Sequence, residues 1–420
     1  MAGTVLMLGT MAALGGPAGA DPTSPWALQN TPNPSGSIGD SLSSVSCASA
    51  TSCEAVGSMS LANVGTPLVE FWNGTAWTVQ PAPVVPGSTA TVLISVSCAS
   101  PNACMAVGYA VDGAGNRVLA SESWNGSAWT VQAISAPAAT TSPLLNSVSC
   151  ATAISCEAVG WAANASNTQI LIADTWNGTA WTNQTPATPA GVGANLTSVT
   201  CVAANSCEAV GSSSTGPGLF GGLAESWNGA AWSEQSVPAP GGTIQSGFSA
   251  VSCPSASSCT AVGTASVSGP GPLTTGEPEI GTWNGSAWSV QALPAPAGEL
   301  DTSLASVSCT SPSNCEAVGS EDTQDNSFGI QTTVAYSWNG LGWTHQDMPA
   351  GDLTELNSVS CTTTCEAVGQ DGSDGPGPVS TAQLAGVEAA PATTLPVSST
   401  GLTGLLDQLL GLIVGIVAAL

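Results

Sequence analysis

Two short patterns of small polar and apolar residues recur along the chain. The first reads Ser-Val-Ser-Cys on the way in and Cys-Glu-Ala-Val-Gly on the way out, as in SVSCASATSCEAVGS at residues 44–58. The second reads Trp-Asn-Gly-x-x-Trp, as in FWNGTAW at residues 71–77. Short runs rich in Val, Ser, Thr and Trp, separated by Gly and Asn, are typical of β-strands joined by tight turns. The patterns therefore predict four short antiparallel strands in each repeat.

The first pattern occurs seven times at a nearly constant spacing. Its first cysteine recurs after 51, 52, 51, 52, 56 and 52 residues. A period near fifty residues is typical of stacked or circular repeat proteins, in which each repeat is one structural unit. The 420 residues are therefore predicted to hold one array of seven units rather than two or three ordinary domains.

Each repeat contains two cysteines, whose spacing predicts a disulfide across a hairpin. Six pairs are C-x5-C and the seventh is C-x3-C. A change of two residues keeps both cysteines on the same face, whereas a change of one would turn one of them away. Zinc would need C-x2-C spacing or several histidines, and the chain has neither. The predicted bridges are Cys47–Cys53, Cys98–Cys104, Cys150–Cys156, Cys201–Cys207, Cys253–Cys259, Cys309–Cys315 and Cys361–Cys365.

The Trp-Asn-Gly-x-x-Trp pattern predicts a second hairpin in each repeat. Asn-Gly is the strongest short signal for a two-residue type I′ turn. That register places Trp72 opposite Thr75 and Glu70 opposite Trp77, so that the two tryptophans become diagonal neighbours on one face. A four-stranded sheet cannot bury two such rings alone, and we expect each repeat to stack on the next.

Seven cysteine hairpins accompany only six Trp-Asn-Gly phrases, because the seventh repeat lacks its last strand. The segment SPWALQ at residues 24–29 matches AWTVQ at 76–80, with Trp26 and Gln29 in phase. We therefore expect the first strand of the chain to complete the last unit and close the ring, which removes the free edge strands. The predicted fold is an all-β, seven-bladed β-propeller of four-stranded antiparallel blades over residues 21–390.

The repeat unit resembles the blades of the kelch and BNR-like propeller superfamily, in a form typical of secreted bacterial repeat proteins with SVSC…CxAVG…WNGxxW blades. The resemblance covers roughly residues 24–390. The kelch Gly-Gly doublet is absent, and the Asp-box of sialidases is only loosely matched by the Trp-Asn-Gly turn. A sialidase would also need three arginines, whereas this chain has only Arg117, and sialidase activity is excluded.

The two ends of the chain differ from the repeats. Residues 1–20 are small and apolar and end in Ala-Gly-Ala, which is typical of a secretory signal peptide. Residues 391–401 form a linker rich in Pro, Ser and Thr, and residues 402–420 predict a short apolar helix. That helix is interpreted as a membrane anchor, with a peripheral amphipathic helix and a self-association helix as alternatives. Paired cysteines agree with export, and we expect a secreted or cell-surface protein.

The charge of the chain limits its partners. The formal net charge is −26, with no lysine. Binding of nucleic acid needs clustered lysine and arginine, so a nucleic-acid partner is excluded. Electrostatic attraction to anionic lipid is excluded for the same reason. The remaining classes of partner are an extracellular protein and a glycan.

Carboxylates are almost the only titratable groups left for catalysis, and a pair of them could support glycoside hydrolysis. The repeated acids occupy the same position in several repeats, which indicates a scaffold role because a catalytic pair is needed only once. These acids are Glu54, Glu157, Glu208, Glu316 and Glu366 after the second cysteine, and Glu70, Glu122, Asp174 and Glu225 before the tryptophan. We therefore predict a non-enzymatic binding or scaffold module, with a carbohydrate-active enzyme (glycoside hydrolase or lyase) as the alternative.

Recognition is predicted on the connections between Ala-Val-Gly and Trp-Asn-Gly, which vary from 14 to 19 residues. They lie opposite the cysteine and Asn-Gly turns, and loops of varied length on a rigid scaffold usually carry binding residues. The longest are residues 264–280 and 320–334. The candidate ligand-face residues are Glu277, Glu279, Glu321, Asp322 and Asp325. No cofactor is expected. Calcium remains an alternative at the acidic segments 112–116, 320–326 and 371–377, none of which has EF-hand spacing.

Overall fold

The computed structural model of the protein describes residues 25–32, 34–61, 64–189, 193–216, 218–268, 274–294, 299–323, 330–348, 353–371 and 382–386. These residues form 28 β-strands and no helix. The predicted signal peptide, the linker and the apolar segment 402–420 lie outside them. Among the described residues, no helix is long and apolar enough to cross a membrane.

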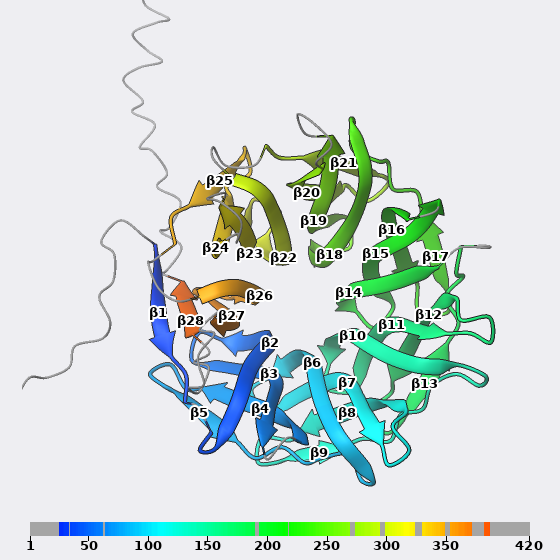
Figure 1. The fold of residues 1–420 in the computed structure, drawn as a ribbon, viewed down its shortest axis with the longest axis vertical. Helices are drawn as coiled ribbons and strands as arrows, with labels where there is room; N and C mark the ends of the chain where they lie inside the picture. Colours follow the sequence, from blue (N-terminus) through cyan, green and yellow to red (C-terminus); the bar gives the residue numbers. More distant parts are fainter. Residues whose placement is uncertain are drawn as a thin grey trace, which may run out of the picture. The chain divides into compact units, whose positions relative to one another are not determined.

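The strands form seven four-stranded antiparallel units around a common centre (Figure 1). A single parallel bridge between Gly276 and Asp301 joins two neighbouring units into one eight-stranded sheet. We call each unit a blade, and each blade runs from an inner strand to an outer strand. Blade 1 contains β2 (Ser37–Ser49), β3 (Ser52–Leu61), β4 (Val64–Trp72) and β5 (Trp77–Gln80). Blade 2 contains β6 (Ser88–Ser100), β7 (Ala103–Asp112), β8 (Arg117–Trp124) and β9 (Trp129–Val131). Blade 3 contains β10 (Thr141–Thr152), β11 (Ser155–Ala163), β12 (Gln169–Trp176) and β13 (Trp181–Gln184).

The remaining four blades follow the same order. Blade 4 contains β14 (Ala194–Ala203), β15 (Ser206–Gly216), β16 (Leu219–Trp227) and β17 (Trp232–Gln235). Blade 5 contains β18 (Thr243–Ser255), β19 (Ser258–Ser268), β20 (Thr274–Trp283) and β21 (Trp288–Ala292). Blade 6 contains β22 (Glu299–Ser311), β23 (Asn314–Thr323), β24 (Ile330–Trp338) and β25 (Trp343–Gln346). Blade 7 contains β26 (Leu353–Cys361), β27 (Cys365–Asp371), β28 (Ala382–Gly386) and β1 (Trp26–Asn30).

The Ser-Val-Ser-Cys phrase joins neighbouring blades. Each inner strand is the edge of its own sheet, so some of its backbone N–H groups have no partner within that sheet. Serine hydroxyls of the preceding blade accept hydrogen bonds from these N–H groups. Val96 N donates to Ser44 Oγ at 3.2 Å, and Cys98 N donates to Ser46 Oγ at 2.9 Å. The same contacts recur at Val148–Ser95, Cys150–Ser97, Val199–Ser147, Cys201–Ser149, Val251–Ser198, Cys309–Ser252, Val359–Ser306 and Cys361–Ser308.

Blade 7 contacts blade 1 in the same way. Val45 N donates to Ser358 Oγ at 3.1 Å, and Cys47 N donates to Ser360 Oγ at 3.0 Å. At the rim, β1 pairs antiparallel with β28, so residues from both ends of the described chain share one sheet. Figure 1 shows β1 in blue beside β28 in orange.

The glycine of Ala-Val-Gly accommodates a bulge in the inner strand. The pairing of β2 with β3 shifts by one residue between Leu42 and Ser44. A Cβ atom on Gly57 would overlap the carbonyl oxygen of Ser41 at this bulge. The same overlap with an inner-strand carbonyl would occur at Gly108, Gly160, Gly211, Gly263, Gly319 and Gly369. A larger residue at this position would therefore displace the inner strand.

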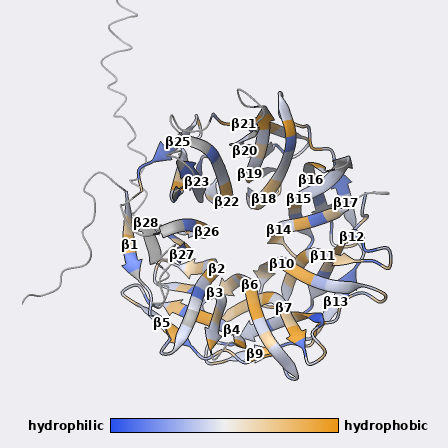
Figure 2. Cartoon of the chain, in the orientation of Figure 1, coloured by the Kyte–Doolittle hydropathy of each residue, from blue (hydrophilic) through white to orange (hydrophobic). Residues whose placement is uncertain are grey.

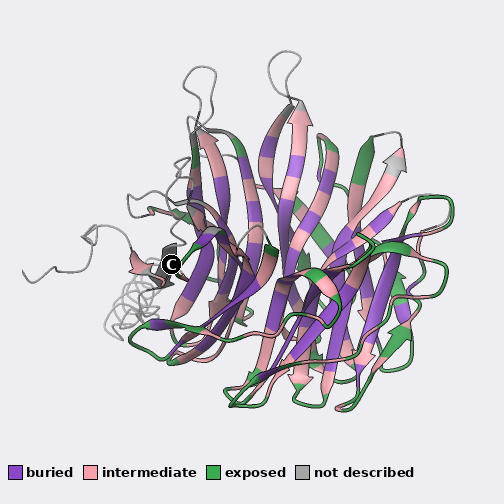
Figure 3. Ribbon diagram, turned by 60° about the horizontal axis from the view of Figure 1, so that its bottom comes forward, coloured by how far each residue is buried: buried purple, intermediate pink, exposed green. Residues whose placement is uncertain are grey.

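Apolar side chains fill the spaces between adjacent blades. In one cluster, Val56 and Val69 of blade 1 pack with Leu93, Val96 and Trp129 of blade 2. Figure 2 shows hydrophobic segments on strands all around the ring, and Figure 3 shows buried positions along the strands with exposed positions gathered at many of the turns. The prediction that each repeat buries its face against the next is therefore confirmed.

The seven predicted disulfides are also confirmed. They are Cys47–Cys53, Cys98–Cys104, Cys150–Cys156, Cys201–Cys207, Cys253–Cys259, Cys309–Cys315 and Cys361–Cys365. The Cα atoms of each pair are 3.9–4.0 Å apart. Both spacings place the two cysteines opposite each other across the inner hairpin.

The predicted two-residue turn at Asn-Gly is wrong. Trp72 lies directly opposite Trp77, and residues 73–76 form a four-residue loop. A type I′ turn needs positive φ at both central residues, but only Gly74 has it, at +88°. Asn73 Oδ1 instead accepts hydrogen bonds from the backbone N–H groups two and three residues ahead, at 2.9 and 3.0 Å. The two tryptophan rings therefore stack directly, with centroids 5.5 Å apart.

Replacing the inner-strand serine should destabilise the ring. Ser306→Ala removes the acceptor of the Val359 N–H group, so we expect the free energy of unfolding to fall by about 1–3 kcal/mol. Blade 5 offers the reverse change, because Ala250 occupies the equivalent position. Ala250→Ser supplies the missing hydroxyl and should leave stability unchanged or raise it by up to about 1 kcal/mol. Denaturant unfolding measures both, and a neutral Ser306→Ala variant would contradict this role.

Candidate functional site

The connections predicted to be variable loops are for the most part strands, so the expectation that they form loops is wrong. The second and third strands of each of blades 1 to 6 pair along nearly their whole length. In blade 1 only residues 62–63 separate β3 from β4. Stretches rich in Ser, Thr and Gly can still form a ladder because the hydrogen bonds come from the backbone. The 14 to 19 residues between the phrases are therefore mainly antiparallel sheet.

Most of the predicted ligand-face acids do not lie on loops. Glu277 and Glu279 lie in β20, Glu321 and Asp322 lie in β23, and Asp325 lies outside the described residues. Glu279 exposes 0% of its surface and accepts a hydrogen bond from Gly247 N at 3.0 Å. Glu279 is therefore part of the packing within blade 5 and cannot face a ligand.

The acids that recur from blade to blade are buried. Glu70, Glu122 and Glu225 each expose 0% of their surface. Burial raises the pKa of Glu70 and Glu122 to about 8 and the pKa of Glu225 to about 7. Burial likewise raises to about 8 the pKa values of Glu54, Glu157, Glu208, Glu316 and Glu366. With one arginine and no lysine in the chain, a neutral carboxylic acid is the form that these sites favour.

Several of these acids belong to a hydrogen-bond chain between blades. Trp129 Nε1 donates to Gln80 Oε1 at 2.8 Å, and Gln80 Nε2 donates to Glu54 Oε1 at 3.3 Å. The same order occurs at Trp288, Gln235 and Glu208. The glutamine three residues after tryptophan and the glutamate after the second cysteine are therefore scaffold residues.

The interface between blades 2 and 3 departs from this scheme. In blade 2, Met105 occupies the position after the second cysteine, where most other blades have glutamate. Gln132 Nε2 instead donates a hydrogen bond to Ser123 Oγ at 2.8 Å. Trp181 of blade 3 donates to Ser121 Oγ instead of to the glutamine, at 3.0 Å. Blade 2 therefore has its own set of contacts to the next blade.

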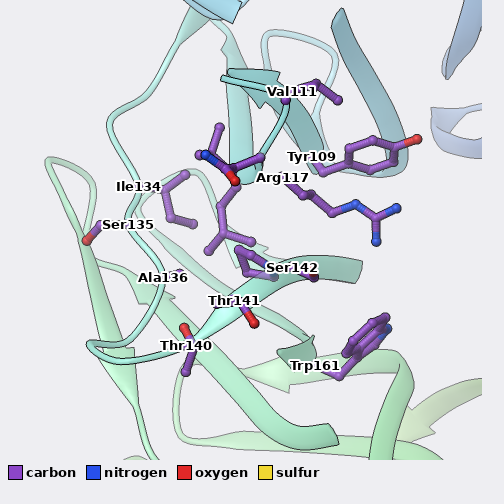
Figure 4. A pocket seen from close by; sticks show the side chains of 15 residues that line it. Tyr109, Val111, Arg117, Ile134, Ser135, Ala136, Thr140, Thr141, Ser142 and Trp161 are labelled. Carbon is purple, nitrogen blue, oxygen red and sulfur yellow. The ribbon is translucent and has the colours of Figure 1, made fainter. Parts of the chain in front are cut away.

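The same two blades enclose a pocket of about 910 Å³ (Figure 4). It is lined by the far ends of β7 and β8, away from the disulfide hairpins, and by the connection between β9 and β10. Its polar lining includes Asn116, Ser135 and Thr141, and its apolar lining includes Leu119 and Ile134. A pocket of this size with a mixed lining falls within the range of small-ligand sites.

The single arginine of the chain lines this pocket together with two aromatic residues. Arg117 Cζ is 4.4 Å from the centroid of the Tyr109 ring, which is a cation–π contact. In the view of Figure 4 the guanidinium group lies between the rings of Tyr109 and Trp161. All three side chains are half-buried. No described carboxylate forms an ion pair with Arg117, so its N–H donors are available to a ligand.

The seven blades provide an internal comparison that separates these residues from the scaffold. The residue after Ala-Val-Gly is aromatic only in blades 2 and 3, at Tyr109 and Trp161. The equivalent residues elsewhere are Ser58, Ser212, Thr264, Ser320 and Gln370. Trp161 is also one of only two tryptophans outside the Trp-Asn-Gly phrases. These two aromatic residues, which break the repeat pattern, could have indicated the pocket from the sequence. The sequence prediction considered acidic residues instead and did not include them.

The backbone beside the pocket adopts a strained conformation. Ala139 has φ +61° and Ser142 has φ +49°, and they are two of the three described non-glycine residues with positive φ. This region costs about 1–2 kcal/mol per residue. Such positions cluster at functional sites, where the surrounding structure holds them in place. Ser142 itself lines the pocket.

In segment 112–116, one of the three segments considered for calcium, the aspartate forms hydrogen bonds within its own turn. Asp112 Oδ1 accepts hydrogen bonds from Ala114 N and Asn116 N, both at 2.8 Å, so its carboxylate closes its own turn. Within the part of the chain that the structure describes, no cluster of three or more His, Cys, Asp or Glu side chains has metal-binding geometry. Most of segment 371–377 and residues 324–326 lie outside that part.

A second hollow of about 480 Å³ lies at the centre of the ring and is lined by inner strands of all seven blades. Several of its polar groups form hydrogen bonds within the fold. Asn146 Nδ2 donates to Asn195 Oδ1 at 2.8 Å and to Leu196 O at 2.7 Å, and Ser44 and Ser95 are among the serines that accept N–H groups from the next blade. The pocket between blades 2 and 3 is therefore the stronger candidate.

Comparison with known proteins establishes the fold alone. The sequence matches no protein-family profile and no curated protein. The structure of YCF48 bound to D1 peptide is 12% identical with a TM-score of 0.50, over 90% of this chain and 99% of that one. The WD40 repeats of RRP9 are 8% identical with a TM-score of 0.50, over 85% and 96% of the two chains. The SapL1 lectin in complex with alpha methyl fucoside is 12% identical with a TM-score of 0.38, over 75% and 98%. The chain is thus a β-propeller of four-stranded antiparallel blades.

The buried acids predict that stability falls as pH rises. Glu70 and Glu122 ionise near 4.5 when unfolded but near 8 when folded, so between these values the folded protein binds more protons and the free energy of unfolding decreases. We expect a higher melting temperature at about pH 5 than at about pH 8.5. The combined variant Glu70→Gln, Glu122→Gln and Glu225→Gln should show a weaker dependence. A melting temperature that rises over this range would contradict burial in the neutral form.

Proposed function

We propose that the protein is an exported, non-enzymatic binding module whose recognition site is the pocket between blades 2 and 3. The observation that carries the proposal is the gathering of Tyr109, Arg117 and Trp161, which depart from the repeat, in one pocket beside strained backbone. Seven disulfides favour an oxidising, extracellular environment. The predicted signal peptide at residues 1–20 agrees with export.

The rival function, a carbohydrate-active enzyme, has weaker support. Glycosidases use two carboxyl groups that face one cleft. The lining of this pocket contains no Asp or Glu. The acids peculiar to blade 5, Glu277 and Glu279, do not form such a pair, because Glu279 is fully buried. The raised pKa values follow from burial between blades, which explains them without catalysis.

The class of partner is an extracellular protein or a glycan. YCF48, which shares the fold, was solved with a bound peptide, so a propeller of this kind accommodates such a partner. The pocket adds a polar wall and an arginine, which suit a small or terminal group of the partner rather than a flat surface.

The pocket can be tested by returning it to the pattern of the other blades. Full-length exported protein is screened on glycan and peptide arrays beside the variant Tyr109→Ser, Arg117→Gln and Trp161→Ser. We expect the variant to lose the hits of the native protein while keeping its melting temperature within a few degrees. Thr264→Ala, at the matched position of blade 5, should keep them. Hits that survive in the triple variant would place recognition elsewhere, and turnover of an array glycan would replace binding with catalysis.

We further propose that β1 closes the ring in solution. Trp26 exposes 3% of its surface, and its Nε1 donates to Gln346 Oε1 of blade 6 at 2.6 Å. Gln29 Oε1 accepts a hydrogen bond from Trp77 Nε1 of blade 1 at 2.8 Å. The N-terminal strand therefore contacts both neighbours of blade 7 with the residues that the other outer strands use.

If β1 closes the ring, Trp26 should contribute as much to the free energy of unfolding as an equivalent tryptophan within the chain. Trp26→Ala and Trp129→Ala should lower the free energy of unfolding by similar amounts, about 3–5 kcal/mol, because each removes a buried ring between blades. Thermal and denaturant unfolding compare the two directly. If Trp26→Ala is neutral while Trp129→Ala is severe, the ring is open at the N-terminus.

A further inference from the structure

We infer that the pocket between blades 2 and 3 binds a sugar that carries one carboxylate, of the uronic acid class. This inference rests on the proposed binding function and names its ligand. The argument uses the geometry of the arginine, the chemistry of the opposite wall and the charge of the whole chain.

The arginine is arranged to receive a carboxylate. Arg117 Cζ lies over the Tyr109 ring, 4.4 Å from its centroid, so the ring packs against the guanidinium group and restricts its movement. A guanidinium group carries its N–H donors in its own plane, where a carboxylate accepts two of them in parallel. Arg117 is half-buried without a described anionic partner, and a bound carboxylate would compensate its charge.

The rest of the pocket suits a hydroxylated ring. Ser135, Thr141 and Ser142 each present a hydroxyl that can donate and accept, and no hydrogen bond within the protein occupies these three groups. Trp161 offers an aromatic face, and Ile134 offers an aliphatic one. A pyranose needs this combination, since its edge carries hydroxyls and its faces carry C–H groups. A peptide C-terminus would also satisfy the arginine, and its backbone amides can pair with hydroxyls, but only a sugar presents hydroxyls at the edge of one ring together with C–H groups on its faces.

The chain charge limits the ligand to few carboxylates. Arg117 is the one arginine in a chain of 27 acidic residues without lysine. A polyanionic strand would be repelled by this field, and a single guanidinium offers it only one anchor. A terminal or isolated uronic acid avoids this repulsion. The inferred ligand is therefore the carboxylated end of a glycan, with its carboxylate at Arg117 and its ring between Trp161 and the hydroxyls.

Two matched sugars test the inference on the full exported protein. Methyl β-D-glucuronide and methyl β-D-glucoside differ only at C6, which carries a carboxylate in the first and a hydroxymethyl group in the second. Isothermal titration or ligand-observed NMR measures the affinity of both. We expect the glucuronide to bind at least about tenfold more tightly. Arg117→Gln should abolish this preference, whereas Trp161→Ser should weaken both sugars. Thr264→Ala serves as the control in blade 5 and should change neither.

The possible failures are distinct. Equal affinity for the two sugars, or a preference that survives Arg117→Gln, would overturn the role of the arginine. The peptide Gly-Gly-Tyr with a free carboxylate is compared with its amide. If only the free peptide binds, in an Arg117-dependent manner, the sugar class is wrong although the binding function stands. If no carboxylate probe binds while array hits persist in the triple pocket variant, both the ligand class and the pocket are wrong.

Discussion

The hydrogen bonds from the inner strands to serine hydroxyls of the preceding blade are the contacts on which the ring depends. Every inner strand faces the centre as an edge, and its unpaired N–H groups would otherwise be left without a protein partner. The repeated phrase resolves this within four residues. In SVSC, each serine hydroxyl accepts a hydrogen bond from a backbone N–H group of the next blade, and the valine packs between blades. The cysteine bridges its own hairpin, and its backbone N–H group donates to a serine of the preceding blade. The glycine of Ala-Val-Gly then allows the bulge beside these serines.

Burial of acids changes the meaning of the formal charge. The value of −26 assumes ionised carboxylates, yet burial raises the pKa to about 7 or 8 at ten of them, namely Glu54, Glu70, Glu122, Glu157, Asp174, Glu208, Glu225, Glu279, Glu316 and Glu366. A neutral acid between blades can serve as a hydrogen-bond partner of glutamine without a cation. This explains how the chain folds with a single basic residue, and it leaves Arg117 unclaimed by the scaffold.

Sequence reasoning succeeded where the determining contacts are local. Cysteines such as Cys47 and Cys53 pair within one hairpin, so spacing alone predicted their bridge. It failed at Asn73, because the side chain closes a four-residue loop that a dipeptide rule does not include. Connections taken for loops proved to be strands, since backbone pairing is not visible in side-chain composition. The pocket was missed because Tyr109 and Trp161 are one repeat apart in sequence, and only the stacking of blades 2 and 3 brings them together.

The local character of the disulfides also bears on how the chain acquires them. Fourteen cysteines can pair in on the order of 100,000 ways, and most exported proteins with many cysteines need enzymatic reshuffling to reach one of them. Here every partner is four or six residues away. Each thiol therefore meets its own partner at a far higher effective concentration than any other, and each bridge can form within its own hairpin without reshuffling. The same short spacing means that no disulfide joins one blade to another, so apart from the backbone connections the blades are held together by hydrogen bonds and packing.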